Sequence, residues 1–255
     1  MSFIDFIFLA LSSGFAGFVD AIAGGGGLVQ LPALLIALNE KPIPLILGTN
    51  KVPSIFGTTS AAINYFRKIK PDPRITTYMV LPAFIGSVSG ARLAASVPKE
   101  IFRPVILILL ILVSIYTFIK PHLGLEEKLR FSQNHTKWIV ALCGLLIGFY
   151  DGIFGPGTGT FLIFLLVGLI GYAFIKASAT AKIVNIATNL GAIISFHFTG
   201  HIWWKLGLAL AVFNVAGGIL GSRLAIKGGN QLVRKFFLFV SVILIAKVGY
   251  DWLYN

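Results

Sequence analysis

The sequence predicts an all-α polytopic membrane protein with two homologous halves, and three observations lead to this prediction. The first is composition, since 56% of the 255 residues are hydrophobic and only 12% are charged, whereas soluble domains carry about 25% charged residues. The second is a series of apolar runs that extends along the whole chain. The third is an internal repeat, which gives both halves the same order of elements.

The apolar runs differ in length within each half. Several reach the roughly 20 residues that a helix needs to cross the hydrocarbon core, and others are clearly shorter. The first half contains Phe3–Ala23, Leu28–Leu38, Val52–Phe66, Ile75–Ala95 and Ile101–Ile119. The second half contains Trp138–Phe154, Thr160–Phe174, Ile183–Phe198, Ile202–Leu224 and Leu232–Leu253. We therefore expect one broken or re-entrant helix and about three to four spanning helices in each half.

The chain matches itself at an offset of 131 residues, the separation of Gly17 from Gly148. The segment "GFVDAIAGGGGLVQLPALL" from Gly17 and "GFYDGIFGPGTGTFLIFLL" from Gly148 agree at nine of nineteen positions. At the same offset "TNKVPSI" aligns with "TAKIVNI", and "GSVSGARLA" with "GGILGSRLA". We divide the chain into a first transmembrane repeat (1–120), a linker loop (121–137) and a second repeat (138–255).

Lysine and arginine gather in the linker and in one loop of each half, and their distribution predicts how the halves are oriented. These three regions hold twelve of the 21 basic residues, which we place in the cytoplasm. They are Arg67, Lys68, Lys70, Arg74, Lys120, Lys128, Arg130, Lys137, Arg223, Lys227, Arg234 and Lys235. This placement requires an odd number of crossings per half, so the halves lie inverted in the membrane, as in many secondary transporters. We expect a multi-pass protein of the cell inner membrane.

Other classes of protein find little support in the sequence. The net charge of +12 is not accompanied by a basic patch with interleaved aromatic residues, so no nucleic acid is expected as a partner. Asp5 stands where a cleaved signal peptide would carry basic residues. Cys143 is the single cysteine, which excludes an intramolecular disulfide.

Neither a cofactor nor a metal is expected. The glycine runs have no GxGxxG or Walker spacing, so they do not predict nucleotide binding. His197 and His201 lie four residues apart, but no third ligand or glutamate is near them in the sequence. The chain also lacks a convincing nucleophile–base pair for an intramembrane hydrolase, and we predict that it is not an enzyme.

Both halves interrupt an apolar run at the same place. Gly24, Gly25, Gly26 and Gly27 do so in the first half, and the segment "GPGTG" (Gly155–Gly159), with Gly155, Pro156, Gly157 and Thr158, does so in the second. Broken backbone at membrane depth persists where protein buries it or where it lines a polar cavity. Helices that restart there point free amides at the midplane and can bind an anion. The alternative is that the glycines only permit close helix packing.

Asp20 and Asp151 are equivalent in the two halves, and each lies just before a break. A carboxylate at the centre of a spanning helix costs roughly 2.5–3.5 kcal/mol, so its presence in both copies indicates a role. Two roles stay open: a proton carrier, or a structural acceptor for the broken backbone. A third possibility is that each carboxylate simply reaches the interface.

Lys51 and Lys182 form a second equivalent pair, each two residues after a threonine, Thr49 or Thr180, that could cap the next helix. The helix dipole opposes a lysine in a first helical turn, and coordination of an anion would explain it; snorkelling to the interface is the alternative. Neutral hydrogen bonds could come from neighbouring polar residues, whereas Asn64 and Asn214 are expected further away. These neighbours are Asn50, Ser54, Asn185, Thr188 and Asn189.

Arg92 and Arg223 form a third pair, near the ends of the runs that contain "GAR" and "GSR". Topology anchoring is expected for them, and pairing with a carboxylate, a phospholipid or the substrate is the alternative. The glycines before them, Gly86 with Gly90 and Gly217 with Gly221, have the GxxxG spacing of closely crossing helices.

The two glycine motifs, with "TNKVPS" after the first and "ATAKIVNIATNLGA" after the second, resemble those of the TauE/SafE family of membrane proteins. The resemblance extends from about Gly14 to Asp251. It implies a multi-pass inner-membrane permease with duplicated halves that moves small sulfur-containing anions such as sulfite or sulfonates, usually outward. It does not specify the substrate or the binding residues.

The sequence thus predicts a secondary transporter of small anions that works by alternating access in the lipid bilayer. The substrate is expected between the halves, next to the breaks, the lysines and the asparagines, with the aspartates as possible coupling groups. The alternative is an H⁺- or Na⁺-coupled carrier, or a channel, for another small organic solute. The GxxxG faces would also permit a homodimer.

Overall fold

The computed structural model describes residues 2–96, 124–131 and 133–254. These residues form helices and no strand, in agreement with the predicted class. In the first half the helices are α1 (Phe3–Ala23), α2 (Gly26–Ala37), α3 (Ile43–Lys68), α4 (Pro73–Leu93) and the short 3₁₀ turn η1 (Ala94–Ser96). The predicted run Ile101–Ile119, Lys120 and the start of the linker lie outside the described residues.

The second half repeats this order with α6 (Gln133–Ile153), α7 (Thr158–Leu165), the π-helical turn η2 (Leu166–Ile170), α8 (Phe174–Phe198) and α9 (Trp204–Tyr254). Four described segments are long and apolar enough to cross a membrane: Phe3–Ala23, His135–Ile153, Phe174–Phe198 and Trp204–Val240. Gly26–Ala37 and Thr158–Ile170 are apolar but shorter. The chain therefore has the mixture of long and short membrane helices that its apolar runs predict.

Helix α9 is divided at Gly229, whose φ of 64° and ψ of −163° are not helical. The part before Gly229 and the part after it correspond to the predicted runs Ile202–Leu224 and Leu232–Leu253. Glycine adopts a positive φ without a steric penalty, which explains why the chain turns there.

Helices α3 and α8 begin earlier than the hydropathy indicates. Helix α3 starts at Ile43, directly after Pro42, and α8 starts at Phe174. Thr49 and Thr180 therefore lie inside helices, and the prediction that they cap helix N-termini is wrong. The polar residues next to Thr49 and Thr180 interrupt the apolar pattern of the sequence, but they do not end the helix. They are buried against other helices of the bundle. The hydroxyl of Thr49 instead accepts a hydrogen bond from the backbone amide of Trp203, at 2.9 Å.

The first helix of each half packs against a helix of the other half. Helix α1 packs along α9, and its equivalent α6 packs along α4, the equivalent of the first part of α9. The glycines of the GxxxG pairs lie at these crossings: Gly86 and Gly90 face the backbone of Leu145 and Phe149, and Gly217 and Gly221 face the backbone of Gly14 and Phe18. The close crossing predicted from the glycine spacing is confirmed, and each crossing joins one half to the other.

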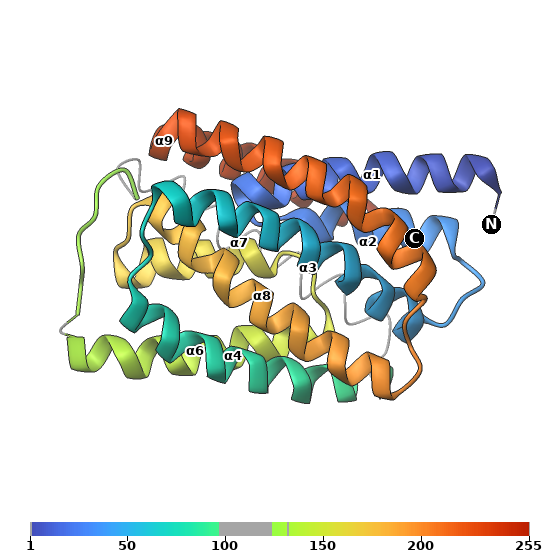
Figure 1. Cartoon of the computed structure of the whole chain (residues 1–255), viewed down its shortest axis with the longest axis horizontal. Coiled ribbons are helices and arrows are strands. Elements are labelled where there is room, and N and C mark those ends of the chain that lie inside the picture. The colour runs from blue at the N-terminus through green and yellow to red at the C-terminus, as the bar shows by residue number, and fades with distance from the viewer. Residues whose placement is uncertain (1, 97–123, 132, 255) are drawn as a thin grey trace.

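Equivalent helices run in opposite directions through the bundle. Figure 1 shows α1, α3 and the first part of α9 running away from the end that holds the N-terminus, whereas α6, α8 and α4 run toward it. The contacts between α1 and α9 agree with these directions. Gly14 lies against Gly217 and Phe18 lies against Gly221, so the residue numbers increase in the same direction along both helices and the helices are parallel.

One end of the bundle gathers the turn at 69–72, the segment 124–131 and the Gly229 turn (Figure 1). The side chain of Asn230 joins two of these regions to α8, since it accepts a hydrogen bond from the Ile175 amide and donates one to the Leu125 carbonyl, each at 2.8 Å. Lys70, Lys128 and Lys227 are exposed in these regions. The three basic regions of the sequence therefore meet at a single end of the molecule.

Candidate functional site

Both predicted breaks are present in the structure. Gly24 ends α1 in the left-handed conformation with φ 79°, and α2 restarts two residues later. In the second half Gly155 and Gly157 have φ values of 84° and 82°, and α7 begins at Thr158. Neither α2 nor α7 has a side chain that caps its N-terminus. The amides of Leu28 and Thr158 donate to the carbonyls of Gly25 and Gly155. Those of Gly26, Gly27 and Gly159 have no hydrogen-bond partner among the described residues.

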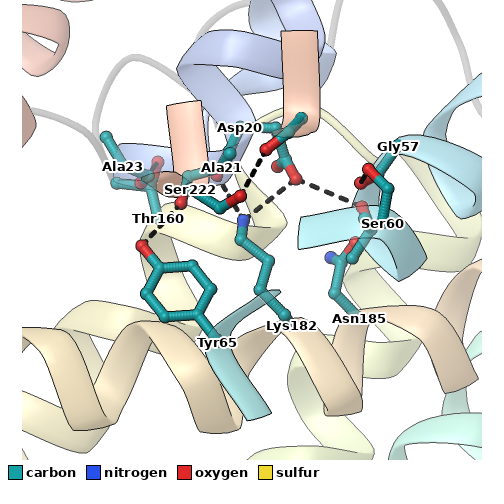
Figure 2. Close-up of polar contacts among 12 residues, drawn as sticks. Asp20, Ala21, Ala23, Gly57, Ser60, Tyr65, Thr160, Lys182, Asn185 and Ser222 are labelled. Carbon is teal, nitrogen blue, oxygen red and sulfur yellow. Dashed lines mark hydrogen bonds and ion pairs between the residues drawn. The ribbon is translucent and has the colours of Figure 1, made fainter. Parts of the chain in front are cut away.

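The two breaks contact each other inside the bundle. The amide of Thr160 donates to the carbonyl of Gly24 at 3.1 Å, and the Thr160 hydroxyl donates to the carbonyl of Ala23 at 3.0 Å (Figure 2). Gly159 lies so close to the Gly24 backbone that a Cβ on it would come within 2.6 Å. The break of one half is therefore held against that of the other by backbone contacts that only glycine permits.

Two buried ion pairs connect the halves reciprocally. The ammonium of Lys51 in α3 lies 2.9 Å from Oδ1 of Asp151 in α6, and the ammonium of Lys182 in α8 lies 2.9 Å from Oδ2 of Asp20 in α1 (Figure 2). Lys51 is equivalent to Lys182 in the repeat, and Asp20 to Asp151. Each lysine therefore pairs with the aspartate of the other half and not with that of its own.

Each lysine also binds the backbone at a break. Lys51 donates to the carbonyl of Asp151 at 2.7 Å, and Lys182 donates to the carbonyl of Asp20. These carbonyls belong to the last turns of α6 and α1, where the helix dipole is negative, and the Asp20 carbonyl also accepts from the Gly24 amide at 2.8 Å. A lysine here serves as a C-terminal cap, so each aspartate–lysine unit stabilises the end of an interrupted helix.

A threonine completes each unit. The hydroxyl of Thr158 donates to Oδ1 of Asp151 at 2.6 Å, and that of Thr58 donates to Oδ2 of Asp20 at 3.1 Å. In both units the threonine and the lysine bind the same carboxylate oxygen. The second oxygen of each carboxylate, Oδ2 of Asp151 and Oδ1 of Asp20, accepts no hydrogen bond from the described residues.

A polar cavity lies between the halves at the breaks. The space that the centre of a water molecule can occupy is about 20 Å³, which is enough for one water molecule. Residues of both halves line it: Ala16, Asp20, Gly24, Gly26, Gly27, Gln30, Asn50, Lys51, Ser54, Thr58, Asp151, Gly155, Thr158, Gly159, Asn185, Asn189 and Asn214. The cavity is thus small and is lined mainly by backbone, side-chain amides, hydroxyls and the charged groups of Asp20, Lys51 and Asp151.

Most residues predicted for a binding site line this cavity, and a few do not. Gly25, Gly157, Lys182, Thr49 and Thr180 are buried but are not part of the lining. Arg92 and Arg223 are exposed side chains and are not part of the lining. They lie on the outer faces of α4 and α9, and topology anchoring stays the prediction for them.

Three lining residues with polar side chains were not predicted from the sequence: Gln30, Thr58 and Asn214. Asn214 was expected further off and instead donates to Oε1 of Gln30 at 2.9 Å and to the carbonyl of Ser13 at 3.0 Å. Its equivalent in the first half is Ala83, so the repeat gave no signal for it. A polar residue in the middle of a spanning helix was the remaining signal.

Three buried polar atoms of lining residues have no hydrogen-bond partner among the described residues. They are Nε2 of Gln30, Oδ1 of Asn50 and Oδ2 of Asp151. Buried polar atoms in native proteins are almost always hydrogen-bonded, and exceptions indicate water or a ligand. The described residues contain no group of histidine, cysteine and carboxylate side chains that could hold a metal ion.

Comparisons with known proteins agree with this architecture. The family described as "Sulfite exporter TauE/SafE" matches residues 9–248. The chain is 37% identical to the probable membrane transporter protein ORF9 of Sinorhizobium sp. over 96% of its own length and 92% of that protein. It is 36% identical to a probable membrane transporter protein of Haemophilus influenzae, which covers 97% of the chain and 96% of the relative.

The Escherichia coli probable membrane transporter protein YfcA is 36% identical over 92% of the chain and 86% of its own length. No solved structure matches the chain. The match over nearly the whole sequence, together with the duplicated glycine breaks and the apolar helices, shows that this chain is a membrane transporter protein of the TauE/SafE family.

Proposed function

We propose that the protein is a secondary transporter, a permease or exporter, of small anions, and that its substrates are sulfite, sulfonates or related sulfur-containing anions. The observation that carries the proposal is the polar cavity between the halves, toward which the N-termini of α2 and α7 restart. A helix N-terminus carries about half an elementary positive charge and offers free amides. The family's description as a sulfite exporter supports the same class of substrate.

The ion pairs change the role that we assign to the lysines. Each ammonium is already bound by a carboxylate and a backbone carbonyl, so it has little positive charge left for a solute. We infer that the first turns of α2 and α7 and the side-chain amides receive the anion. Lys51 and Lys182 hold the ends of the interrupted helices in place.

Alternating access is supported by the exchange of packing partners. The glycine crossings join α1 to α9 and α6 to α4, and we propose that each joined pair moves as a unit. Equivalent helices run in opposite directions (Figure 1), as expected if the halves are inverted in the membrane. Rocking of one unit against the other would open the cavity to one side at a time.

The end that gathers the exposed lysines (Lys70, Lys128 and Lys227) is proposed to face the cytoplasm by the positive-inside rule. The opposite end, with the turn at 38–42 and Gly200, would then face the outside of the inner membrane.

The test is efflux of sulfite from proteoliposomes that contain the purified protein. Saturable efflux above that of empty liposomes is expected. Gly27→Leu should abolish most of it, because a Cβ at Gly27 already lies 3.3 Å from Cα of Pro156 and a larger side chain fills the cavity. Ser89→Leu, on an exposed face of α4, is the matched control and should retain efflux. Efflux no faster than from empty liposomes would contradict the proposal, and full activity of Gly27→Leu would remove the cavity from the pathway.

A second candidate function is an H⁺- or Na⁺-coupled carrier for another small organic solute. It is favoured by the two carboxylates that line the cavity, each with one unbound oxygen. Flux of a non-anionic solute that follows an imposed H⁺ or Na⁺ gradient, with no flux of sulfite, would support this candidate against the first.

A further inference from the structure

The unbound carboxylate oxygens in the cavity restrict the kind of anion that it can accept. In the Asp151 unit, Lys51 and Thr158 both bind Oδ1, while Oδ2 is buried and accepts no hydrogen bond from the described residues. Asp151 is 2% exposed. A carboxylate oxygen can only accept, so its missing partner must be a hydrogen-bond donor.

The Asp20 unit has the same arrangement. Lys182 (Figure 2) and Thr58 both bind Oδ2. Asp20 lines the cavity, and its other oxygen accepts no hydrogen bond from the described residues. A ligand without hydrogen would therefore place its negative oxygens near two carboxylate oxygens, and like charges at short range repel.

The charges around the cavity lead to the same restriction. The carboxylates of Asp20 and Asp151 balance the ammonium groups of Lys51 and Lys182, so the side chains contribute no net formal charge. The positive potential left for an anion comes from the N-termini of α2 and α7, at about half an elementary charge each. Their sum matches one negative charge and not two.

One donor in the lining is also free for the anion. Gln30 is 1% exposed and its Nε2 has no hydrogen-bond partner among the described residues. Its Oε1 accepts from Nδ2 of Asn214 at 2.9 Å, and the same Nδ2 donates to the Ser13 carbonyl at 3.0 Å. These contacts fix the orientation of both amides, so the Gln30 side chain presents its NH₂ group as an unpartnered donor.

We propose that the cavity selects a singly charged anion that still carries a hydrogen-bond donor, such as the monoprotonated form of an oxyanion, over the fully deprotonated dianion. The negative oxygens bind the unpartnered backbone amides of Gly26, Gly27 and Gly159, which line the cavity, and Nε2 of Gln30. The hydrogen of the anion is donated to Oδ2 of Asp151 and remains on the anion. This inference rests on the proposed function, because it assumes that the cavity binds the transported anion.

The experiment compares anions of similar shape as competitors of sulfite efflux in proteoliposomes. Sulfamate and methanesulfonate are both singly charged near neutral pH, but only sulfamate has N–H donors; sulfate is doubly charged and has none. We expect sulfamate to compete at least about tenfold better than methanesulfonate or sulfate, since a hydrogen bond to a buried charged group contributes roughly that factor. Sulfite itself should move faster in mildly acidic than in mildly alkaline buffer, because its singly charged fraction falls as the pH rises.

The pH comparison needs a control for the protein's own groups. The titratable groups at the cavity are Asp20 of α1, Lys51 of α3, Asp151 of α6 and Lys182 of α8, whereas α2, α7 and α9 contribute amides, hydroxyls and backbone. Sulfamate and methanesulfonate keep one charge over this pH range, so any pH effect on their competition reports on the protein alone.

Asp151→Asn tests the assigned hydrogen bond. The amide oxygen can keep the contacts with Lys51 and Thr158, while its NH₂ group occupies the position of Oδ2. The preference for sulfamate over methanesulfonate should then fall to about equal competition. Glu127→Gln makes the same chemical change in an exposed ion pair with Lys176 and should leave the preference intact.

The outcomes separate this inference from the proposed function. Sulfite efflux with equal competition by sulfamate, methanesulfonate and sulfate in the wild-type protein would overturn the inference and leave the proposed function standing. Absence of sulfite efflux would overturn the proposed function itself. If Asp151→Asn does not fold, the wild-type competition series decides.

Discussion

At the scale of single residues, the charged groups inside this transporter are explained by their position at helix ends. A buried ion pair is stable only when further hydrogen bonds satisfy both partners. Lys51 and Lys182 meet this condition because each binds a carboxylate and a carbonyl of the last turn of a broken helix. Of the roles that the sequence left open for Asp20 and Asp151, their contacts favour that of structural acceptors.

Removal of one member of a buried pair should therefore destabilise the protein strongly. We expect Lys51→Met to lower the free energy of unfolding by about 3–5 kcal/mol, since it leaves the Asp151 carboxylate buried without a counter-ion. Addition of Asp151→Asn should recover most of this loss. Thermal unfolding of the single and double variants in detergent measures both effects.

The exposed pair Lys176–Glu127, with exposed fractions of 24% and 36%, provides the control. Lys176→Met should change stability by less than about 1 kcal/mol. Equal losses at Lys51 and Lys176, or no recovery in the double variant, would show that burial of the pair does not govern its contribution. A loss of transport in Lys51→Ala alone would also not identify an anion ligand, because folding is affected.

At the scale of elements, two kinds of glycine define the helices. Those at the breaks adopt backbone conformations that other residues avoid, and those at the crossings allow two helix backbones to touch. Gly24 does both, because its φ is 79° and the backbone of Gly159 lies against it. Gly24 therefore both ends helix α1 and permits the contact between the two breaks.

Gly24→Ala should therefore be more harmful than an equivalent change elsewhere. Gly200 also has a positive φ, of 73°, but nothing lies within 4 Å of a Cβ there. We expect Gly200→Ala to cost about 1–2 kcal/mol from backbone strain alone, and Gly24→Ala to cost clearly more because α7 must move. The difference in unfolding temperature between the two variants checks this, and similar temperatures would contradict it.

The crossing of α4 and α6 provides a second prediction. Gly86 faces the carbonyl of Leu145 and the amide of Phe149, so Gly86→Leu should separate the helices and reduce the yield of folded protein. The neighbouring position Ser89 is exposed, and Ser89→Leu should be tolerated. Size-exclusion profiles of the two variants after solubilisation measure the outcome, and a normal profile for Gly86→Leu would show that close approach is not required.

At the scale of the whole molecule, opposite directions of equivalent helices place the basic residues of both halves at one end (Figure 1). If equivalent helices instead ran in the same direction, the basic turn after α3 and the basic turn at Gly229 would lie at opposite ends of the molecule. Because α1 packs along α9 and α6 packs along α4, each half depends on the first helix of the other half for its packing. The cavity therefore lies where both halves contribute lining residues.

This topology predicts the sidedness of single cysteines in a Cys143→Ser background. Glu40→Cys and Gly200→Cys should react with a membrane-impermeant maleimide in intact cells, since both positions are exposed at the end opposite the basic one. Lys70→Cys and Lys128→Cys should react only after permeabilisation. Labelling of all four positions from outside, or of Lys70→Cys alone, would contradict the proposed orientation.

Much of the architecture could be predicted from the sequence because its signals are local or repeated. The apolar runs predict membrane helices, and the glycine and proline clusters predict the breaks. The start of α3 could not be placed, because the polar residues Thr49, Asn50 and Lys51 are buried inside a helix and disrupt the apolar pattern without ending the backbone. The outer-face positions of Arg92 and Arg223 could not be derived from the repeat, because repetition alone does not distinguish a lining residue from one on an outer face.

The sequence by itself determined the class of protein, the duplication, the positions of the breaks and the residue types next to them, since each follows from neighbouring residues or from one constant offset. Only the tertiary structure decided which lysine meets which aspartate. Lys51 and Asp151 are 100 residues apart and Lys182 and Asp20 are 162 apart, and the repeat would equally permit pairing within a half. The exchange of α1 and α6 across the bundle selects the reciprocal pairs, because it brings the broken end of each helix next to the lysine of the other half.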